Sequence, residues 1–378
     1  MIQILPSFIA TEAEISWDSA HADILSSCDP GEVTNGLRAA SSIEGFKALA
    51  APDSTVAENR HIRCPVVRPT GAKSGEVHDR VCILLHGLNE RGWDKYWDWA
   101  HAIADKARCA VILFPIAFHM DRSPATWADF GIMRGISKDR IARYPGLKQS
   151  SMANAAISER LDRDPGRFFL SGLMSARDLM DLVTVLRSGK AAGIASNATL
   201  GYFGYSIGAY LLQCLTLADP RFANAGKRFL FCGGPYLSAM TPVSKYILDS
   251  RAHERILDFW VYNLEAERGR NAELAALLDT PEGRAFCAMV DPRHPQLERR
   301  SSFSDGASRV VSLTGDEVMP KAAILDFFRG TNVVPTVFDL PPTSTHVAPF
   351  NPIGGEPVRT AFENVFDEAA AHLFGQEP

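Results

Sequence analysis

The sequence predicts an α/β protein with a mostly parallel central sheet flanked by helices. Short apolar runs at 80–85, 110–115 and 198–203 alternate with segments whose apolar residues recur at helical spacing. Strands that alternate with helices form βαβ units, which place the strands parallel to one another. A tight Gly-Tyr-Ser-Ile-Gly turn at 204–208 joins the third run to a helix. Together these features predict helices on both faces of one sheet.

The elements follow in a consistent order along the chain. Residues 1–58 show no clean strand alternation, and we interpret them as a partly helical N-terminal extension packed on the core. The main domain spans 59–378, and its first β-type run begins at His61. The 80–85 strand is followed by a helix with apolar side chains on one side, from Trp93 to Ile103.

Two segments of the main domain lack any convincing strand, and we interpret them as insertions. They span residues 119–167 and 236–305, and the second is rich in helix formers. Connections this long are usually functional. Each follows a predicted strand at its carboxyl end, so we expect the two insertions to form a helical cap or lid over that edge of the sheet.

The chain ends with the remaining elements of a βαβ architecture. Strand-like runs at 228–232, 308–313 and 333–338 follow the glycine turn, and the final apolar stripe at 358–373 has the 3.6-residue spacing of a helix.

Composition excludes several classes of protein. The chain of 378 residues is 46% hydrophobic and 22% charged with a net charge of −5, which is ordinary for a soluble globular protein and argues against nucleic-acid binding. The seven cysteines form no C-x-x-C pair, so we expect no metal site and no cofactor. No apolar run reaches the length of a membrane span, and the N-terminus lacks the basic start of a signal peptide. We therefore predict a cytoplasmic protein.

The turn at 204–208 predicts a catalytic serine. A strand that turns sharply into a helix exposes the side chain at the apex, which here is Ser206. The flanking glycines allow the two backbones to approach closely. A serine hydroxyl becomes nucleophilic only beside a base, and its reaction needs an acid and an oxyanion hole as well. The alternative is a small residue in an ordinary glycine turn.

A candidate acid and a candidate base follow the serine along the chain, in that order. Asp316 comes directly after the 308–313 strand, and His346 lies in the loop between the last predicted strand and the final helix. This order of Ser206, Asp316 and His346, with the glycine turn before them, resembles the α/β-hydrolase superfamily. The resemblance covers roughly residues 60–375.

The resemblance implies a role for each of these residues. His346 would be the base, Asp316 would orient it, and Ser206 would form the covalent intermediate. Family members often carry Gly-x-x-Asp-x-Val/Ile-x-Pro around the acid. Here Val318 and Pro320 match, whereas Gly315 stands two residues nearer to the acid than the pattern requires. Glu317 is therefore the rival acid.

The oxyanion hole is expected from two backbone N–H groups, those of Leu88 and Ile207. Ile207 follows the nucleophile at the start of a helix, and Leu88 follows the His86-Gly87 pair after the 80–85 strand. The loop from His86, with its H-G-x-x-E pattern, also resembles that of monoacylglycerol-lipase-like hydrolases. We interpret His86 itself as a structural histidine.

Two residues near the start of the first insertion have alternative interpretations. Arg122 could bind a substrate carboxylate, and Trp127 could line an acyl pocket. An arginine more often pairs with a nearby acid, such as Asp121 or Asp129, and a tryptophan more often lies buried under a lid. We prefer the structural interpretation for both residues.

The sequence thus predicts a serine hydrolase of the carboxylesterase type that acts on a small-molecule ester. The first insertion has nine basic and six acidic residues, and the second has many apolar ones. This composition favours small or medium acyl groups in a partly apolar pocket with a cationic rim. An amidase or peptidase with the same triad is the alternative within enzymes, and a non-catalytic binding protein on this fold is the alternative outside them.

Overall fold

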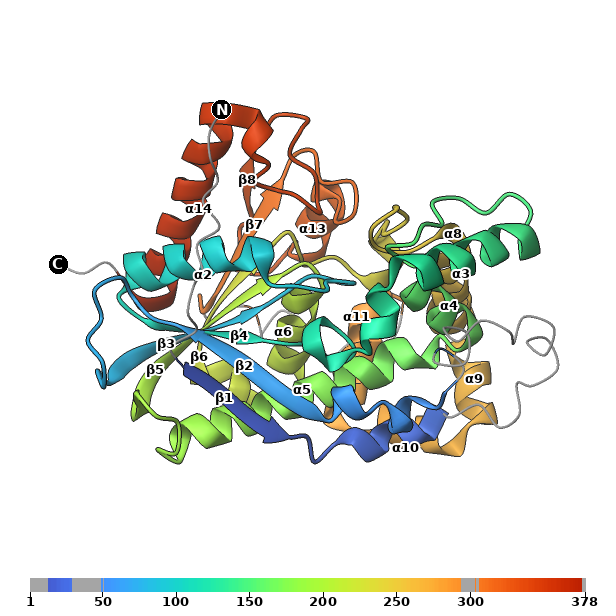
Figure 1. Ribbon diagram of the computed structural model, residues 1–378, viewed down its shortest axis with the longest axis horizontal. Coiled ribbons are helices and arrows are strands. Elements are labelled where there is room, and N and C mark those ends of the chain that lie inside the picture. Colours follow the sequence, from blue (N-terminus) through green and yellow to red (C-terminus); the bar gives the residue numbers. More distant parts are fainter. Residues whose placement is uncertain (1–12, 29–48, 50, 294–302, 304–305, 376–378) are drawn as a thin grey trace.

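The fold is built on one sheet of eight strands. The computed structural model describes residues 13–28, 49, 51–293, 303 and 306–375 (Figure 1). The strands are β1 (Ala13–Asp18), β2 (His61–Val67), β3 (His78–Leu85), β4 (Ala110–Phe114), β5 (Ile194–Tyr205), β6 (Gly226–Phe231), β7 (Ser308–Leu313) and β8 (Thr336–Phe338). Their spatial order is β1-β2-β4-β3-β5-β6-β7-β8.

The sheet is mostly parallel, as the sequence predicts. Strands β4, β3, β5, β6, β7 and β8 run parallel to their neighbours, whereas the β1–β2 and β2–β4 pairs are antiparallel. Leu85 at the end of β3 pairs with both Phe114 of β4 and Gly204 of β5. The loops that follow β3 and β5 therefore start at the same level of the sheet.

Helices cover both faces of the sheet, because its strands are apolar on both sides. Helices α2 (Asp94–Ala107) and α14 (Gly355–Phe374) share one hydrophobic cluster with Cys82 and Leu84 of β3. Helices α5 (Gly166–Arg187) and α6 (Ile207–Ala218) share the other cluster with Val81, Ile83 and Leu85. Successive residues of β3 thus point into opposite cores, as the period of a strand requires.

The N-terminal segment contributes a strand, which corrects our interpretation of residues 1–58. β1 lies at the edge of the sheet, where Ile15 pairs with Cys64 of β2. The alternation of Ala13, Ile15 and Trp17 with polar residues is a strand signal. It extends over only six residues and leads into the 3₁₀ helix η1 (Ala22–Cys28), so it does not stand out in the sequence.

The described parts of both insertions are helical. The first contains η4 (Met120–Arg122), η5 (Ala125–Ala128), α3 (Phe130–Arg143) and α4 (Ala155–Arg163). The second contains η6 (Leu237–Ala239), α8 (Ser250–Leu257), the π-helix η7 (Asp258–Tyr262), α9 (Leu264–Arg270), α10 (Ala272–Leu278) and α11 (Pro281–Val290). Helices α3, α4 and α8 gather at the end of the molecule away from α14 (Figure 1).

A buried arginine joins the two insertions. Arg140 of α3 makes a two-pronged ion pair with Asp249, the N-cap of α8, with Nε–Oδ2 and Nη2–Oδ1 distances of 2.7 and 2.9 Å. Its Nη1 also donates to Glu159 of α4 at 2.7 Å. All three side chains are buried, so this ion-pair network links the first insertion to α8.

Two further elements lie in the C-terminal part of the chain. Helix α13 (Lys321–Phe327) follows β7, and the short η8 (Pro352–Gly354) precedes α14. The short helices η2 (Asp53–Thr55), η3 (Ala57–Asn59) and α7 (Pro220–Ala225) link other elements. Within the described ranges, no helix combines the length and the apolar character that crossing a membrane would require.

Candidate active site

The turn between β5 and α6 places Ser206 at its apex in a strained conformation. The φ and ψ angles of Ser206 are 57° and −117°, in a region that non-glycine residues rarely adopt. Its backbone N–H donates to the carbonyl of Phe231 on the neighbouring strand β6 at 3.0 Å. This hydrogen bond to β6 helps to keep Ser206 in its strained conformation. A sharp, strained turn from strand to helix is the geometry of a nucleophile elbow.

The two glycines of the motif are required by the closeness of the backbones. A Cβ atom on Gly204 would lie 2.7 Å from the Cα of Ala209 in α6. A Cβ atom on Gly208 would lie 2.7 Å from the carbonyl oxygen of Leu85 at the end of β3. Both separations are far inside van der Waals contact, so only glycine fits at either position.

Ser206, His346 and Asp316 form one chain of hydrogen bonds. The Nε2 atom of His346 lies 2.7 Å from the Oγ of Ser206, and its Nδ1 lies 2.7 Å from the Oδ2 of Asp316. All three side chains are buried. Because a carboxylate only accepts, it fixes the proton of the imidazole on Nδ1 and leaves Nε2 free to accept the serine proton.

The carboxylate of Asp316 is fixed by the backbone that follows it. Its Oδ1 accepts hydrogen bonds from the N–H groups of Val318 and Met319 at 2.9 and 2.8 Å, which turns Oδ2 toward the histidine. Glu317, the rival acid, has an exposed side chain, whereas Asp316 is 5% exposed. The geometry therefore brings Asp316, and not Glu317, to His346.

The histidine loop is attached to the sheet and to α2. The hydroxyl of Tyr205 donates to the backbone carbonyl of His346. The ammonium of Lys95 donates to the carbonyl of Val347 at 3.1 Å and pairs with Glu90. Neither Tyr205 nor Lys95 stands out in the sequence as a site residue, because both hold the loop through main-chain carbonyls, which leave no motif.

Hydrogen bonds that involve Tyr96 and Glu90 hold the loop after β3 in place. The N–H of Gly87 donates to the hydroxyl of Tyr96 at 2.9 Å, and that hydroxyl donates to Glu90 at 3.1 Å. Leu88 and Ile207, the two residues expected to supply oxyanion donors, both line the cavity at Ser206. The N–H of Ile207 belongs to the first turn of α6, where backbone N–H groups lack helical partners.

His86 is a structural histidine in this arrangement. Its Nε2 accepts from the N–H of Ile116 at 2.9 Å, so its Nδ1 carries the proton and donates to the carbonyl of Gly87 at 2.8 Å. Burial lowers the pKa of His86 to about 3, which keeps the ring neutral. The side chain thus joins the loop after β3 to the loop after β4.

The cavity at Ser206 is largely apolar. Besides the serine and Ile207 it is lined by Leu88, Phe168, Leu237, Met240, Pro242, Ile247, Leu248, His253, Ile256, Val318 and Met319. Seven of these residues come from the second insertion, and all of them except His253 are apolar. A second apolar cavity shares Leu88, Phe168 and Ile207 and extends along α5 and α6 toward Cys214 and Phe286.

The two residues of the first insertion with open interpretations are structural. Arg122 is fully buried and donates to Asp178 of α5 at 2.8 Å, so its partner is neither Asp121 nor Asp129. Trp127 is also buried, with its ring stacked on Phe118 at a centroid distance of 6.1 Å.

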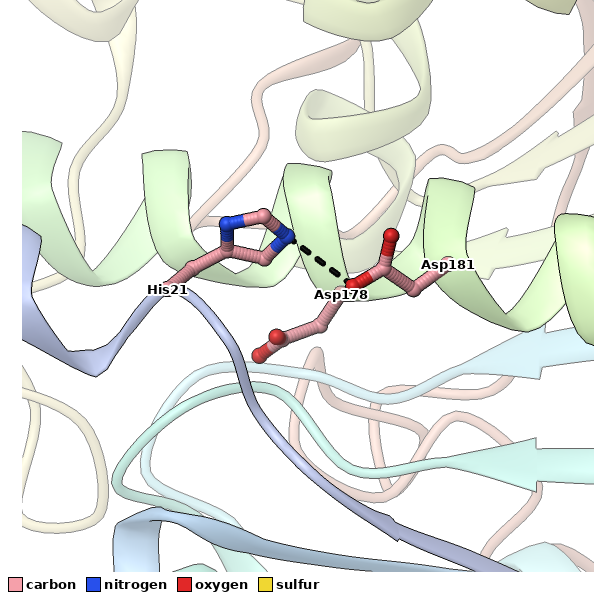
Figure 2. Close-up of side chains that lie close together, drawn as sticks. All are labelled: His21, Asp178 and Asp181. Carbon is pink, nitrogen blue, oxygen red and sulfur yellow. Dashed lines mark hydrogen bonds and ion pairs between the residues drawn. The ribbon is translucent and has the colours of Figure 1, made fainter.

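The side chains of His21, Asp178 and Asp181 lie close together and are of the types that bind metal ions (Figure 2). Several of their possible ligand atoms already have protein partners. His21 Nε2 lies 2.9 Å from Asp181 Oδ2. Both oxygens of Asp178 are already engaged, one by Ser19 at 2.5 Å and the other by the Arg122 guanidinium at 2.8 Å. The cluster therefore fits an ion-pair network that attaches the N-terminal segment to α5, and a cation would face Arg122.

The strand order, the helices on both faces and the elbow after β5 define the α/β-hydrolase fold. Within it, the chain belongs to the family of unknown function DUF6051, whose model matches residues 8–374. No curated protein matches the sequence.

Solved structures of similar fold include several hydrolases. A thermostable esterase from Pseudomonas putida ECU1011 is 14% identical over 83% of this chain and 80% of its own, with a TM-score of 0.46. Carboxyl esterase 2 from the mycorrhizal fungus Tuber melanosporum is 11% identical over 83% and 82%, with a TM-score of 0.47. An alpha-beta serine hydrolase homologue from Coxiella burnetii is 11% identical over 82% and 91%, with a TM-score of 0.40.

Proposed function

We propose that the protein is a serine hydrolase that cleaves a carboxylic ester through an acyl-enzyme on Ser206. The observation that carries this proposal is the chain of 2.7 Å hydrogen bonds from Ser206 through His346 to Asp316 at the apex of a strained turn. A nucleophile, a base and an orienting acid in this geometry are what acyl transfer requires.

The first half of the reaction forms the acyl-enzyme. As the Oγ of Ser206 attacks the ester carbonyl, its proton passes to Nε2 of His346, and Asp316 stabilises the imidazolium. The N–H groups of Leu88 and Ile207 stabilise the negative charge on the carbonyl oxygen. When the C–O bond to the alcohol breaks, the imidazolium returns the proton to the leaving alkoxide.

The second half releases the acid. Water attacks the acyl carbonyl, His346 Nε2 accepts its proton, and the same two N–H groups stabilise the second tetrahedral intermediate. Collapse of this intermediate breaks the bond to Ser206, whose Oγ regains the proton from the imidazolium. The products are one carboxylic acid and one alcohol, and the enzyme is restored.

The insertions at 119–167 and 236–305 act in this proposal as a cap that selects the substrate. The second supplies six apolar residues, together with His253, to the lining of the cavity at Ser206, which supports a preference for small or medium acyl groups. The buried, unpaired cysteines of the described chain, such as Cys64 and Cys82, support a cytoplasmic location, because thiols persist in reducing compartments.

A panel of p-nitrophenyl esters of increasing chain length, run beside p-nitroanilides of the same acids, tests this function. We expect turnover of esters that peaks at short to medium chains and falls for long ones. Faster turnover of the anilides would favour an amidase or peptidase. A preference for long-chain emulsified esters would contradict the proposed role of the cap.

A further inference from the structure

A third cavity opens beside the candidate active site and is lined by three arginines. Leu88 and Phe168 line both this cavity and the one that contains Ser206. Beyond them lie Arg91, from the loop after β3, Arg160 of α4 and Arg167 of α5. We refer to Arg91, Arg160 and Arg167 and the space between them as the arginine pocket.

The arginine pocket has more positive than negative charge. Arg160 and Arg167 share one buried carboxylate, that of Asp53, at 2.8 and 3.2 Å. Asp164 acts on Arg160 as a second negative charge. Three guanidiniums thus face two carboxylates, which leaves about one positive charge without a counterpart.

The surplus charge is that of Arg91. Its hydrogen bonds go to neutral oxygens, the hydroxyl of Ser123 at 2.9 Å and the side-chain carbonyl of Asn89 at 3.3 Å, and it lies over the Trp127 ring. Among the described residues, no carboxylate forms an ion pair with Arg91. Burial and the nearby Arg160 lower the pKa of Arg91 to about 10, so a bound anion would stabilise its charge.

A second, independent observation points to an anion at the same place. Arg167 lines the arginine pocket and is 4% exposed. Its Nε lies 3.2 Å from Asp53 Oδ2 but has no hydrogen-bond partner among the described residues. A buried polar atom without a partner costs free energy. Because Nε carries a proton to donate, a carboxylate oxygen of a ligand would satisfy it.

Arg91 is also close to the proposed reaction centre along the chain. It follows Leu88 by three residues, so their Cα atoms are at most ~11 Å apart. Asn89, between them, has a φ of 63° and donates to the carbonyls of Ala153 and Tyr246, one in each insertion. The loop that presents Arg91 is therefore fixed relative to Leu88.

We propose that the arginine pocket binds a carboxylate of the substrate, so that the protein hydrolyses esters in which a short spacer separates the scissile carbonyl from a free carboxylate. This inference rests on the hydrolase function proposed above. A single surplus positive charge matches a carboxylate better than a phosphate dianion. The planar guanidinium of Arg91 can also hold both carboxylate oxygens at once.

Two esters of matched length test the proposal. Monoethyl glutarate carries the carboxylate, and ethyl pentanoate has a methyl group in its place; release of ethanol is measured for both. We expect the wild type to have the higher kcat/KM on monoethyl glutarate. Arg91→Met should lower the ratio of the two kcat/KM values by ~10- to 100-fold, the value of a charge-assisted hydrogen bond. Arg91→Lys should restore part of it.

The control is Arg329→Met, because Arg329 is exposed two residues after the end of α13 and far along the chain from the pocket. It should leave the ratio unchanged. A wild-type ratio at or below one, or an equal ratio in Arg91→Met, would overturn the proposal while leaving ester hydrolysis intact.

Direct binding separates this proposal from the proposed function. The Ser206→Ala variant, which cannot form an acyl-enzyme, should bind monoethyl glutarate in calorimetry, and the Ser206→Ala/Arg91→Met double variant should bind it ~10-fold or more weakly. Equal affinities of the two variants, or tighter binding of inorganic phosphate, would overturn the carboxylate assignment. A wild type that binds the monoester but does not cleave any ester would instead overturn the hydrolase function.

Discussion

The phenol ring of Tyr205 is stacked on the imidazole of His346, with a centroid distance of 5.4 Å and an interplanar angle of 20°. Its hydroxyl donates to the backbone carbonyl of the same histidine. Tyr205 directly precedes Ser206, so one residue links the position of the proposed nucleophile to that of the proposed base.

Tyr205→Phe tests this link, because it keeps the stacked ring and removes the hydroxyl. Loss of one neutral hydrogen bond is worth about 1 kcal/mol, and we expect kcat on p-nitrophenyl acetate to fall ~5- to 10-fold with little change in KM. Tyr202→Phe is the matched control, since the Tyr202 hydroxyl is buried without a partner in the described structure. Equal kcat in Tyr205→Phe and the wild type would show that the hydroxyl does not position His346.

Substitutions of the two neighbouring acids after β7, Asp316 and Glu317, should differ strongly in their effect on kcat. Asp316→Asn keeps the shape of the side chain but lets an amide face Nδ1, which favours the wrong tautomer of His346. We expect kcat to fall by up to about four orders of magnitude. Glu317→Gln, at an exposed side chain, should change kcat by less than about twofold. The assignment would be reversed by a larger loss in Glu317→Gln.

The buried ion pair between Arg140 and Asp249 should dominate the stability of the cap. Asp249→Asn leaves the Arg140 charge without its two-pronged partner, and breaking a buried pair costs about 3–5 kcal/mol. We expect a clear fall in Tm. The exposed pair of Arg359 with Glu356 provides the control, since Glu356→Gln should cost less than about 1 kcal/mol. Similar Tm values for the two variants would mean that the pair does not hold the insertions together.

Position 208 requires glycine because the backbone of β3 leaves no room for a side chain there, and not because the backbone needs to be flexible. Gly208→Ala places a Cβ 2.7 Å from the Leu85 carbonyl, and overpacking of this kind costs about 1–3 kcal/mol. Gly269→Ala is the control, because nothing lies within 4 Å of its Cβ position in α9. It should stabilise the protein by up to about 1 kcal/mol through helix propensity. An unfolding free energy for Gly208→Ala equal to the wild type would contradict the close approach.

The sequence predicts those parts of the fold that have a strong local pattern. Strand β7 spans Ser308–Leu313, as its apolar run indicates, and the parallel sheet follows from the alternation of strands and helices. The sequence does not reveal strand β1, because this six-residue edge strand has three half-buried and three exposed side chains and owes its structure to pairing with β2.

Site residues with a direct chemical role were easier to predict than those that support them. Ser206, Asp316 and His346 were found by motif and chain order, and the structure brings their side chains together. Arg91 and Arg160 could not be placed in one pocket from the sequence, because α4 reaches the loop after β3 only through the tertiary arrangement of the insertion.

The central claim is that Ser206 is the nucleophile, and covalent labelling tests it most directly. The protein is treated with a fluorophosphonate probe, digested and analysed by mass spectrometry for the modified peptide. We predict a single adduct on Ser206, which Ser206→Ala abolishes while its circular dichroism and Tm match the wild type. Labelling of Ser206→Ala at the wild-type rate, or an adduct on another serine, would contradict the account.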